Sequence, residues 1–358
     1  MANFISFQPN DNFKTVIYAG TGSSQSITGV GFEPNFTWTK DRGNTEDHSL
    51  WDTPRGVTEY ISANGSWVEA TMANGLTAWG ADGFTAGGNN STNNSSRNYV
   101  AWNWKGGTTS APAGSTAGVQ AVSINADAGI GIYKYNGAYP AGKIIKHGLG
   151  RIPEFLMVKN LVTGSTDWAC YHSRIIASSS RSDYSQAGDY FIRLNTVAAK
   201  SDNSGYFHDT LTTSTDITLA SDNPVGGDGQ TCVLYAFCNV PGFSRFGTYM
   251  GNADADGQYI PLGFKPAMVI IKRSDGGDGW NMWDNKRNLN NVRKLFLSPD
   301  SAEADQTGST DHVLDFLSNG FKIRGSGSET NTNGGSYIFM AWAAEPLVSS
   351  NSKPATAA

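Results

Sequence analysis

The amino-acid sequence predicts an all-β protein built from three tandem antiparallel β-sandwich modules. Three observations lead to this prediction: short apolar runs lie between turn-forming residues, helical periodicity is scarce, and one series of motifs occurs three times. The 358 residues include 42 Gly and 13 Pro, a composition typical of many strands joined by turns. The best helical candidates, residues 287–297 and 197–202, are short, so we expect helix to be a minor component.

The composition argues against several classes of protein. Lys plus Arg (26) against Asp plus Glu (31) gives a formal charge of −5, too acidic and too diffuse for a nucleic-acid or membrane-surface binder. No apolar run approaches the roughly 20 residues of a membrane span, and residues 1–14 lack the features of a signal peptide. We therefore expect a soluble chain that inserts into no membrane. Its three cysteines are expected to be reduced, consistent with assembly in a cytoplasm.

The internal repeat is the most informative feature of the sequence. A G-x-x-P motif is followed by a strand-like run that ends in lysine six residues after the proline, and an arginine follows fifteen residues later. The proline, lysine and arginine of the three copies are Pro34, Lys40 and Arg55; Pro153, Lys159 and Arg174; and Pro266, Lys272 and Arg287.

Further motifs keep the same order. A strand ending in Tyr-x-Gly precedes each G-x-x-P, and an aromatic strand closes each copy. These matches predict β-sandwich modules of jelly-roll or lectin-like type at 1–107 (with an N-terminal lead-in), 119–245 and 246–348, a flexible linker at 108–118 and a disordered tail at 349–358. The Gly, Ser, Thr, Ala and Pro run that suggests the linker begins at Gly106, whereas the apolar segment 239–246 predicts a rigid junction between modules two and three.

The strand after each proline predicts how closely the modules associate. In modules two and three this strand is continuously apolar, as expected when both faces are covered. In module one the residues at 36–39 alternate between aromatic and threonine, which predicts one solvated face. Module one is therefore expected to be the more separate unit.

The recurring charged residues are interpreted as structural, because a catalytic group is needed once in a protein whereas a packing group is needed once in every module. We expect Arg55 to pair with Asp52 and Arg287 to pair with Asp284, since the planar arginine side chain suits a bidentate carboxylate contact. Module two has Tyr171 and His172 where the others have Trp-Asp, so a shared role is not expected there.

Taken together, these motifs resemble a repeat domain of unassigned chemistry from tailed bacteriophages, notably podovirus-like phages of marine bacteria. The resemblance rests on the G-F-x-P frame, the strand ending in lysine, the Trp-Asp pair before arginine, the Asn319-Gly320-Phe321-Lys322 turn and the closing strand at 337–342. It covers roughly residues 7–347. It implies a virion structural or tail-fibre-like protein and carries no catalytic residues to this chain.

Motifs for common catalytic sites are not found in the sequence. The histidines lack zinc-site spacing, and the chain has no Cys-x-x-Cys, no G-x-S-x-G elbow and no phosphate-binding loop. His147 lies in a turn-like context, where a structural role is favoured. A pair of carboxylates could still act as in a glycosidase, but no particular pair stands out. The chain is therefore expected not to be an enzyme.

One segment resembles the first half of a calcium-binding loop. Asn252, Asp254 and Asp256 place oxygen donors at alternate positions before Gly257, as in an EF-hand. The bidentate glutamate expected at the twelfth position is missing, because Gly263 stands there. An ordinary polar turn is favoured over a calcium site, and no other cofactor is expected.

Exposed aromatic side chains are the best candidates for binding. Tryptophans near polar, Gly-rich stretches suit a sugar ring or a partner protein; they are Trp51, Trp67, Trp79, Trp168, Trp280 and Trp283. Trp67 and Trp79 are favoured among them. Asn89 and Asn90 belong to a long polar loop that is expected to be either a surface hairpin tip or a contact loop.

The sequence thus predicts a bacteriophage virion component, with a tail fibre or a receptor-binding or adaptor protein favoured. A capsid decoration or head-fibre protein and a host-polysaccharide depolymerase are the alternatives. The expected partners are other virion proteins, further copies of the chain (a trimer by family analogy) and a host surface glycan. The expected location is the virion, assembled in the host cytoplasm.

Overall fold

The structure, a computed structural model, describes residues 7–137, 140–176, 186–308, 311–344, 347–348 and 354–355. The fold is all-β, as predicted. Most of the segment 349–358, predicted to be a disordered tail, lies outside the described residues; two short strands, β28 (Leu347–Val348) and β29 (Pro354–Ala355), pair with each other near the end of the chain.

Module one has a main sheet of order β1-β9-β3-β4-β5-β6 and an outer sheet of order β2-β8-β7. Its elements are η1 (Pro9–Asp11), β1 (Phe13–Ala19), β2 (Gln25–Ile27), β3 (Phe36–Asp41), β4 (Ser49–Asp52), β5 (Glu59–Ser62), β6 (Ala70–Thr71), β7 (Leu76–Gly80), β8 (Gly83–Ala86) and β9 (Asn98–Trp104).

Module two has a main sheet of order β10-β11-β18-β13-β14 and two small sheets, β12-β17 and β15-β16. Its elements are β10 (Gly118–Asn125), β11 (Ile130–Asn136), β12 (Lys143–Lys146), β13 (Pro153–Asn160), β14 (Ala169–His172), β15 (Tyr190–Phe191), β16 (Ser201–Asp202), α1 (Ser204–Phe207), β17 (Asp216–Leu219), η3 (Asn223–Val225) and β18 (Thr231–Cys238).

Module three has a main sheet of order β19-β27-β21-β22, an outer sheet of order β20-β26-β25 and the pair β23-β24. Its elements are β19 (Ser244–Met250), β20 (Tyr259–Pro261), β21 (Pro266–Arg273), β22 (Trp280–Asp284), β23 (Leu295–Phe296), β24 (Gln306–Thr307), β25 (Leu314–Leu317), β26 (Gly320–Ile323), α2 (Ser328–Asn331) and β27 (Ser336–Ala343).

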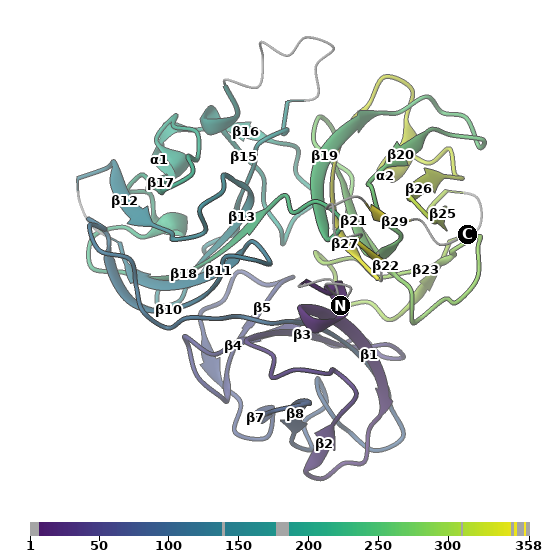
Figure 1. Ribbon diagram of the computed structural model, residues 1–358, viewed down its shortest axis with the longest axis horizontal. Coiled ribbons are helices and arrows are strands. Elements are labelled where there is room, and N and C mark those ends of the chain that lie inside the picture. Colours follow the sequence, from purple (N-terminus) through teal and green to yellow (C-terminus); the bar gives the residue numbers. More distant parts are fainter. Residues whose placement is uncertain are drawn as a thin grey trace, which may run out of the picture.

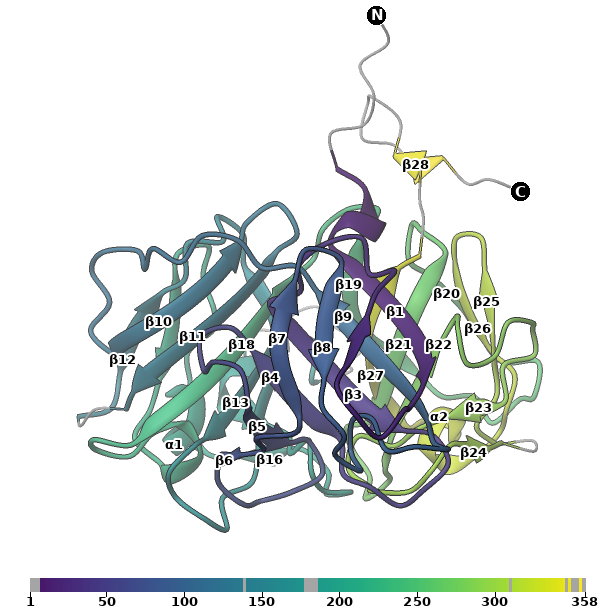
Figure 2. The same ribbon diagram turned by 90° about the horizontal axis from the view of Figure 1, so that it is seen from below.

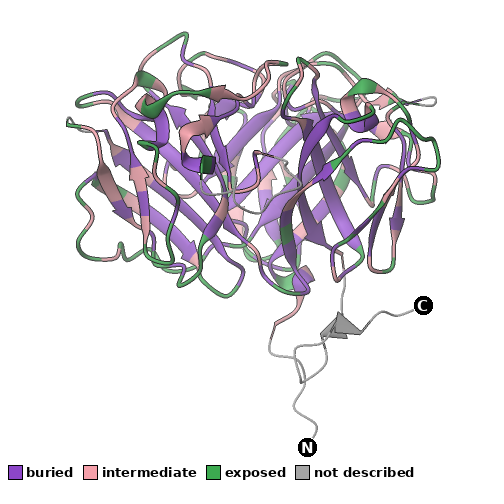
Figure 3. Cartoon of the chain, turned by 90° about the horizontal axis from the view of Figure 1, so that it is seen from above, coloured by how far each residue is buried: buried purple, intermediate pink, exposed green. Residues whose placement is uncertain are grey.

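The same four-strand order recurs in the three main sheets, as β1-β9-β3-β4, β11-β18-β13-β14 and β19-β27-β21-β22. The three modules are arranged around a common centre (Figure 1). The strands of the main sheets are largely buried, and exposure is concentrated in the loops (Figure 3). The arrangement therefore resembles a ring of three similar units within one chain.

An aromatic triad joins the three modules at their centre. Trp104, Phe237 and Trp342 occupy equivalent positions on the closing strands β9, β18 and β27. The ring centroids lie 6.3 Å apart for Trp104–Phe237, 5.4 Å for Trp104–Trp342 and 5.5 Å for Phe237–Trp342. A single cluster of buried apolar residues extends from this triad into all three modules.

Module one is therefore not the more separate unit, and that prediction is wrong. Every residue of Phe36–Asp41 is buried, although the strand alternates in polarity. The hydroxyl of Thr37 donates to Asn103 Oδ1 at 2.9 Å, and the indole of Trp51 donates to Thr39 Oγ1 at 3.3 Å. Because these polar atoms are paired, the threonine face can be covered by the outer sheet at little cost.

The segment predicted to be a flexible linker is held at both ends. Within the glycine-rich run 106–118, Thr108 and Ile124 exchange two backbone hydrogen bonds of 2.9 Å, and Thr116 N–H donates to Ile144 O at 2.8 Å. The prediction missed these contacts because small polar residues bury little side-chain area, while their backbone groups still pair with a neighbouring strand.

The Tyr-x-Gly motif fixes the loop that precedes each closing strand. The tyrosine hydroxyl donates at 2.7 Å to a carbonyl of that loop, in the pairs Tyr18–Thr92, Tyr135–Val225 and Tyr249–Thr330. A Cβ on the motif glycine would lie 2.1, 1.9 and 2.1 Å from a backbone oxygen, in the pairs Gly20–Asn94, Gly137–Gly226 and Gly251–Thr332. Glycine is therefore required by the close approach of two backbones.

The described chain enters and leaves the ring at the same end. Near its start, the Phe7 ring packs edge-on against Phe243 with centroids 5.2 Å apart. Near its end, Ala344 N–H donates to Lys265 O at 2.9 Å. The first described residues, drawn in dark purple, lie on this side of the ring in Figure 2. We call the opposite end, which carries the β3–β4, β13–β14 and β21–β22 turns, the hairpin end.

Replacing the central ring of Phe237 tests whether the three modules share one core. Phe237→Ala is expected to lower the free energy of unfolding by about 3–5 kcal/mol, because it leaves a cavity bordered by all three modules. Urea unfolding followed by tryptophan fluorescence and by circular dichroism should give one coincident transition for both proteins. Two separate transitions, with one of them unaffected by the substitution, would contradict a shared core.

Candidate functional site

The three recurring lysines close the hairpin turns of their own modules. Lys40 Nζ donates to Asp41 O at 2.7 Å and to Asn44 O at 3.2 Å. Lys159 Nζ donates to Thr166 O at 2.5 Å.

Lys272 Nζ closes the third turn and also reaches module two. It donates to Arg273 O at 2.9 Å, to Asp278 O at 2.5 Å and to Val197 O at 3.1 Å. The three ammonium groups therefore serve separate turns and do not meet in one cleft.

Burial sets the electrostatics of these lysines. The side chains of Lys40, Lys159 and Lys272 are fully buried. Burial lowers the pKa of each ammonium group to about 8, although nearby carboxylates such as Asp41, Asp167 and Asp300 act in the opposite direction.

The predicted arginine–aspartate pairs are present in modules one and three. Arg55 Nε lies 2.5 Å from Asp52 Oδ2, and Arg287 Nε lies 2.5 Å from Asp284 Oδ2, with all four side chains fully buried. Burial raises the pKa of the Asp284 carboxyl, but the Arg287 guanidinium outweighs this effect and holds that pKa below its ordinary value.

A neighbouring module completes each of these carboxylates. The Tyr235 hydroxyl of module two donates to Asp52 Oδ2 of module one at 2.6 Å. The Trp102 indole of module one donates to Asp284 Oδ2 of module three at 3.3 Å. Trp102 and Tyr235 occupy equivalent positions, two residues before the aromatic triad. The two contacts therefore repeat one interface around the ring.

A second contact of the same arginines involves a segment that we call the arm, residues 64–69 in module one, 195–200 in module two and 300–305 in module three. This contact ties the arm to the neighbouring module. Arg55 Nη1 lies 3.3 Å from Glu69 Oε1, and Glu69 N–H donates to Leu161 O of module two at 3.1 Å. In the same way, Arg287 Nη1 lies 2.8 Å from Asp305 Oδ1.

The Asp305 arm then reaches module one through two contacts. Asp305 N–H donates to Arg42 O at 2.8 Å, and Asp305 Oδ2 pairs with Arg42 Nε, also at 2.8 Å. Contacts thus connect the closing strand of module one to the buried pair and the arm of module three, and this arm contacts the hairpin of module one.

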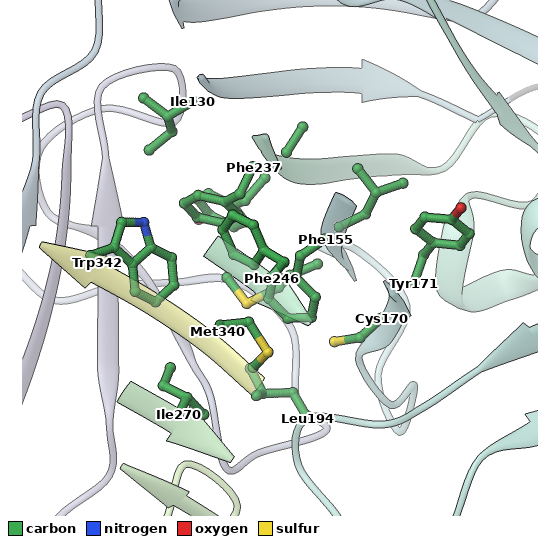
Figure 4. Close-up of a cluster of buried hydrophobic side chains, with 14 of the residues drawn as sticks. Ile130, Phe155, Cys170, Tyr171, Leu194, Phe237, Phe246, Ile270, Met340 and Trp342 are labelled. Carbon is green, nitrogen blue, oxygen red and sulfur yellow. The ribbon is translucent and has the colours of Figure 1, made fainter. Parts of the chain in front are cut away.

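The interface between modules three and two has other residues in place of the buried pair and its donor. Met340 stands where the others have Trp102 or Tyr235, and it packs in an apolar cluster of modules two and three (Figure 4). His172 replaces the aspartate and is opposite Phe155, as Asp52 is opposite Phe36. Burial lowers the pKa of His172 to about 3, so the imidazole is neutral at pH 7.

The arginine of this interface is also replaced, which corrects the predicted role of Arg174. The hairpin of module two is one residue longer, so the third residue after His172 is Ile175, fully buried, and Arg174 lies one position earlier. The fifteen-residue spacing from the lysine therefore does not lead to the equivalent residue in module two. Lys200 takes the place of Glu69, and its N–H still donates to Ser274 O of module three at 2.9 Å.

Indole side chains supply another contact that repeats around the ring. The Trp168 indole of module two donates to Ser62 O of module one at 2.8 Å, and the Trp280 indole of module three donates to Arg193 O of module two at 2.9 Å. His48 stands at the third equivalent position. Sequence reasoning missed these roles, because a buried tryptophan and an exposed one give the same local pattern.

The two favoured tryptophans differ in exposure. The Trp67 side chain is 44% exposed on the arm of module one and lies over Gly65. Trp79 is half-buried and packs against the outer-sheet core of module one. The other four candidates, Trp51, Trp168, Trp280 and Trp283, are fully buried. Trp67 therefore remains the candidate for a contact.

Asn89 and Asn90 form hydrogen bonds with other residues of module one. Asn89 Oδ1 accepts from Ser91 N–H at 2.8 Å, and Asn90 O accepts from the Tyr99 hydroxyl at 2.7 Å. The Asn90 side chain is exposed and accepts from Asn94 Nδ2 at 2.6 Å. A contact through this loop stays a prediction for the exposed Asn90.

The segment that resembles a calcium loop is a polar turn. Asn252 Oδ1 accepts from Asp254 N–H at 3.1 Å. The Asp256 carboxylate pairs at 2.7 Å with both Lys322 and Arg324. Across the described part of the chain, no group of three or more His, Cys, Asp and Glu side chains is arranged to hold a metal ion.

These features define a ring-shaped all-β protein whose recurrent polar residues bind its own modules together. The chain belongs to the family described as "Domain of unknown function (DUF7483)", whose model matches residues 8–346. That match spans all three modules. No curated protein and no solved structure matches the chain. Among the described residues, no helix is long and apolar enough to cross a membrane.

Breaking one buried pair tests its importance. Asp52→Asn is expected to lower the free energy of unfolding by about 3 kcal/mol, because Arg55 keeps its charge in a buried site without its closest carboxylate. Asp256→Asn is the control, since this side chain is 71% exposed and its loss should cost about 0.5 kcal/mol. Equal effects in urea denaturation would show that the buried pair is unimportant.

The buried lysines predict a pH dependence of stability. Because the pKa of Lys159 is about 8 in the folded chain and about 10.4 in an unfolded chain, the folded state binds fewer protons between these values. Stability is therefore gained as the pH rises from 8 towards 10 and lost as it falls through 8, with a slope of at most about 1.4 kcal/mol per pH unit from this group.

The measurement is the unfolding free energy of the wild type and of Lys159→Met at pH 7.5, 8.5 and 9.5. The difference between the two proteins isolates Lys159 from the tyrosines that also titrate at high pH. The wild type should gain stability relative to the variant as the pH rises. A difference that does not change with pH would contradict a lowered lysine pKa.

Proposed function

We propose that this protein is a structural component of a bacteriophage virion that acts as a rigid display module, as part of a tail fibre or of a receptor-binding or adaptor assembly, and that it is not an enzyme. The observation that carries the proposal is the use of the recurrent polar residues. The three recurrent lysines, together with Arg55 and Arg287, all make contacts inside the ring. These recurrent side chains thus stabilise the folded ring.

The geometry of the chain ends supports display. The described chain enters and leaves beside the same end of the ring (Figure 2), so the hairpin end is free to face outward. Trp67 is 44% exposed, and Glu69 of the same arm contacts Leu161 beside the β13–β14 turn at that end. An exposed indole is a suitable platform for a host surface glycan or for a neighbouring virion protein. The sequence resemblance to phage structural repeats points the same way.

Locating the protein in purified phage particles tests this proposal. Mass spectrometry should detect the chain in particles, and cryo-microscopy should place a three-lobed density on the tail. Density on the capsid would instead assign it to capsid decoration or a head fibre. Absence of the chain from particles would overturn a virion role. Release of reducing sugar from host envelope material by the purified protein would show a depolymerase.

The role of Trp67 is tested by host adsorption. In phage carrying Trp67→Ala, adsorption is expected to fall at least fivefold while particle assembly is unchanged, because the substitution removes exposed aromatic contact area. Tyr259→Ala is the matched control, since Tyr259 is also 44% exposed but lies on the outer sheet of module three. Equal adsorption by both variants would exclude Trp67 as a receptor contact.

A further inference from the structure

In each module, a side chain at the start of the arm accepts a hydrogen bond from the backbone next to the second hairpin strand. In module one, Asn64 Oδ1 accepts from His48 N–H at 2.9 Å, and Asn64 Nδ2 donates to Asp47 Oδ1 at 2.6 Å.

Module two repeats this arrangement. Asn195 Oδ1 accepts from Trp168 N–H at 3.0 Å, and Asn195 Nδ2 donates to Asp167 Oδ1 at 2.8 Å. In both modules an amide therefore links a backbone donor to a carboxylate, and every polar contact joins a donor to an acceptor.

Module three keeps the contact to the backbone N–H but, in its described part, has no hydrogen bond between an amide and an aspartate at this place. Asp300 takes the place of the asparagine, and its Oδ1 accepts from Trp280 N–H at 3.0 Å. Gly279 takes the place of the aspartate. A Cβ at Gly279 would lie 3.4 Å from Asp300 Oδ2 and 3.5 Å from Glu329 Oε1. Two carboxylate oxygens thus border the space that holds an aspartate side chain in the other modules.

A buried amide at the same place has an unused oxygen. Asn281 is 0% exposed, and its Nδ2 donates to Glu329 Oε2 at 2.9 Å. Its Oδ1 has no hydrogen-bond partner among the described residues. Since the nitrogen of this amide holds Glu329, its free oxygen lies within a few ångströms of the same carboxylate. A buried acceptor without a donor is costly, and a bound water or cation can satisfy it.

Among the described residues, no lysine or arginine hydrogen-bonds to the Asp300 carboxylate. Burial raises the pKa of Asp300 to about 6, and the nearby Glu329 adds to this effect. Lys272 is close enough to lower that pKa, but its ammonium is already bonded to three carbonyls. Of the other neighbours, Asp278 is paired with Arg273 at 2.9 Å.

Glu329 is held in place by groups of module three. His312 Nε2 lies 2.8 Å from Glu329 Oε2, and the Gly279 backbone also lowers the pKa of Glu329 by hydrogen bonding. Modules one and two show that an asparagine satisfies the arm at the position of Asp300. Module three therefore holds a second carboxylate beside Glu329 at a position where an asparagine makes the same backbone contact, which is typical of a functional site.

We propose that Asp300, Glu329 and Asn281 form a cation site in module three, with Ca²⁺ as its occupant. Carboxylate and amide oxygens are the donors that Ca²⁺ prefers, and it accepts irregular geometry completed by water. Gly279 provides the room, because it removes the side chain that fills this space in modules one and two. The site lies in one module only and is independent of the proposed virion role.

Terbium luminescence tests the site in the full-length protein. Tb³⁺ replaces Ca²⁺ and is sensitised by a nearby indole. Trp280 is close to the site, because its backbone N–H donates a hydrogen bond to Asp300. Excitation of tryptophan should give saturable Tb³⁺ emission that Ca²⁺ displaces. Asp300→Asn should weaken Tb³⁺ affinity at least tenfold and leave the fold intact, because asparagine is the residue found at this position in modules one and two.

The control is Asp256→Asn in the loop at 252–257, which should leave Tb³⁺ binding unchanged. In the same experiment, Ca²⁺ should raise the Tm of the wild type and not that of Asp300→Asn. Emission that does not saturate, or that is lost in Asp256→Asn and kept in Asp300→Asn, would overturn the proposal. Wild-type protein whose Tm is unaffected by Ca²⁺ would likewise contradict the proposed site.

Discussion

A buried aspartate held between its own arginine and a donor from the next module is the interaction on which the ring depends. Asp52 and Asp284 are fully enclosed, so each requires both partners to offset the loss of water. Because the donor comes from a neighbouring closing strand, the carboxylate is satisfied only when two modules are correctly docked. The aromatic triad supplies apolar contact area at the centre, whereas these pairs fix the orientation of one module on another.

The interface between modules three and two shows that these residues act as a set. Where Met340 removes the donor, His172 replaces the aspartate and Ile175 replaces the arginine. A carboxylate at that place would have no donor opposite it, and an arginine would have no carboxylate, so the apolar and neutral residues suit each other. Departure from the repeat is thus compensated here, whereas among the described residues no lysine or arginine hydrogen-bonds to the Asp300 carboxylate.

Much of the fold could be predicted from the sequence, because the repeated motifs mark the same strands in each module. The pairs of Arg55 and Arg287 were also predictable, since an aspartate three residues away is close in any tight turn. The donors Tyr235 and Trp102 could not be predicted, because they lie more than 180 residues from their carboxylates. The alternating threonines of β3 predict a solvent-facing strand and a separate module one, and this prediction is wrong because the threonine hydroxyls are paired and buried.

The most direct measurement transplants the interaction into the interface that lacks it. His172→Asp alone should destabilise the protein by several kcal/mol in urea unfolding, because it buries a carboxylate without partners. Adding Met340→Tyr, Ile175→Arg and Lys200→Glu supplies the donor, the arginine and the acidic arm found in module one, and should recover most of that loss. A quadruple variant no more stable than His172→Asp would contradict the claim that one repeated set of contacts holds the ring together.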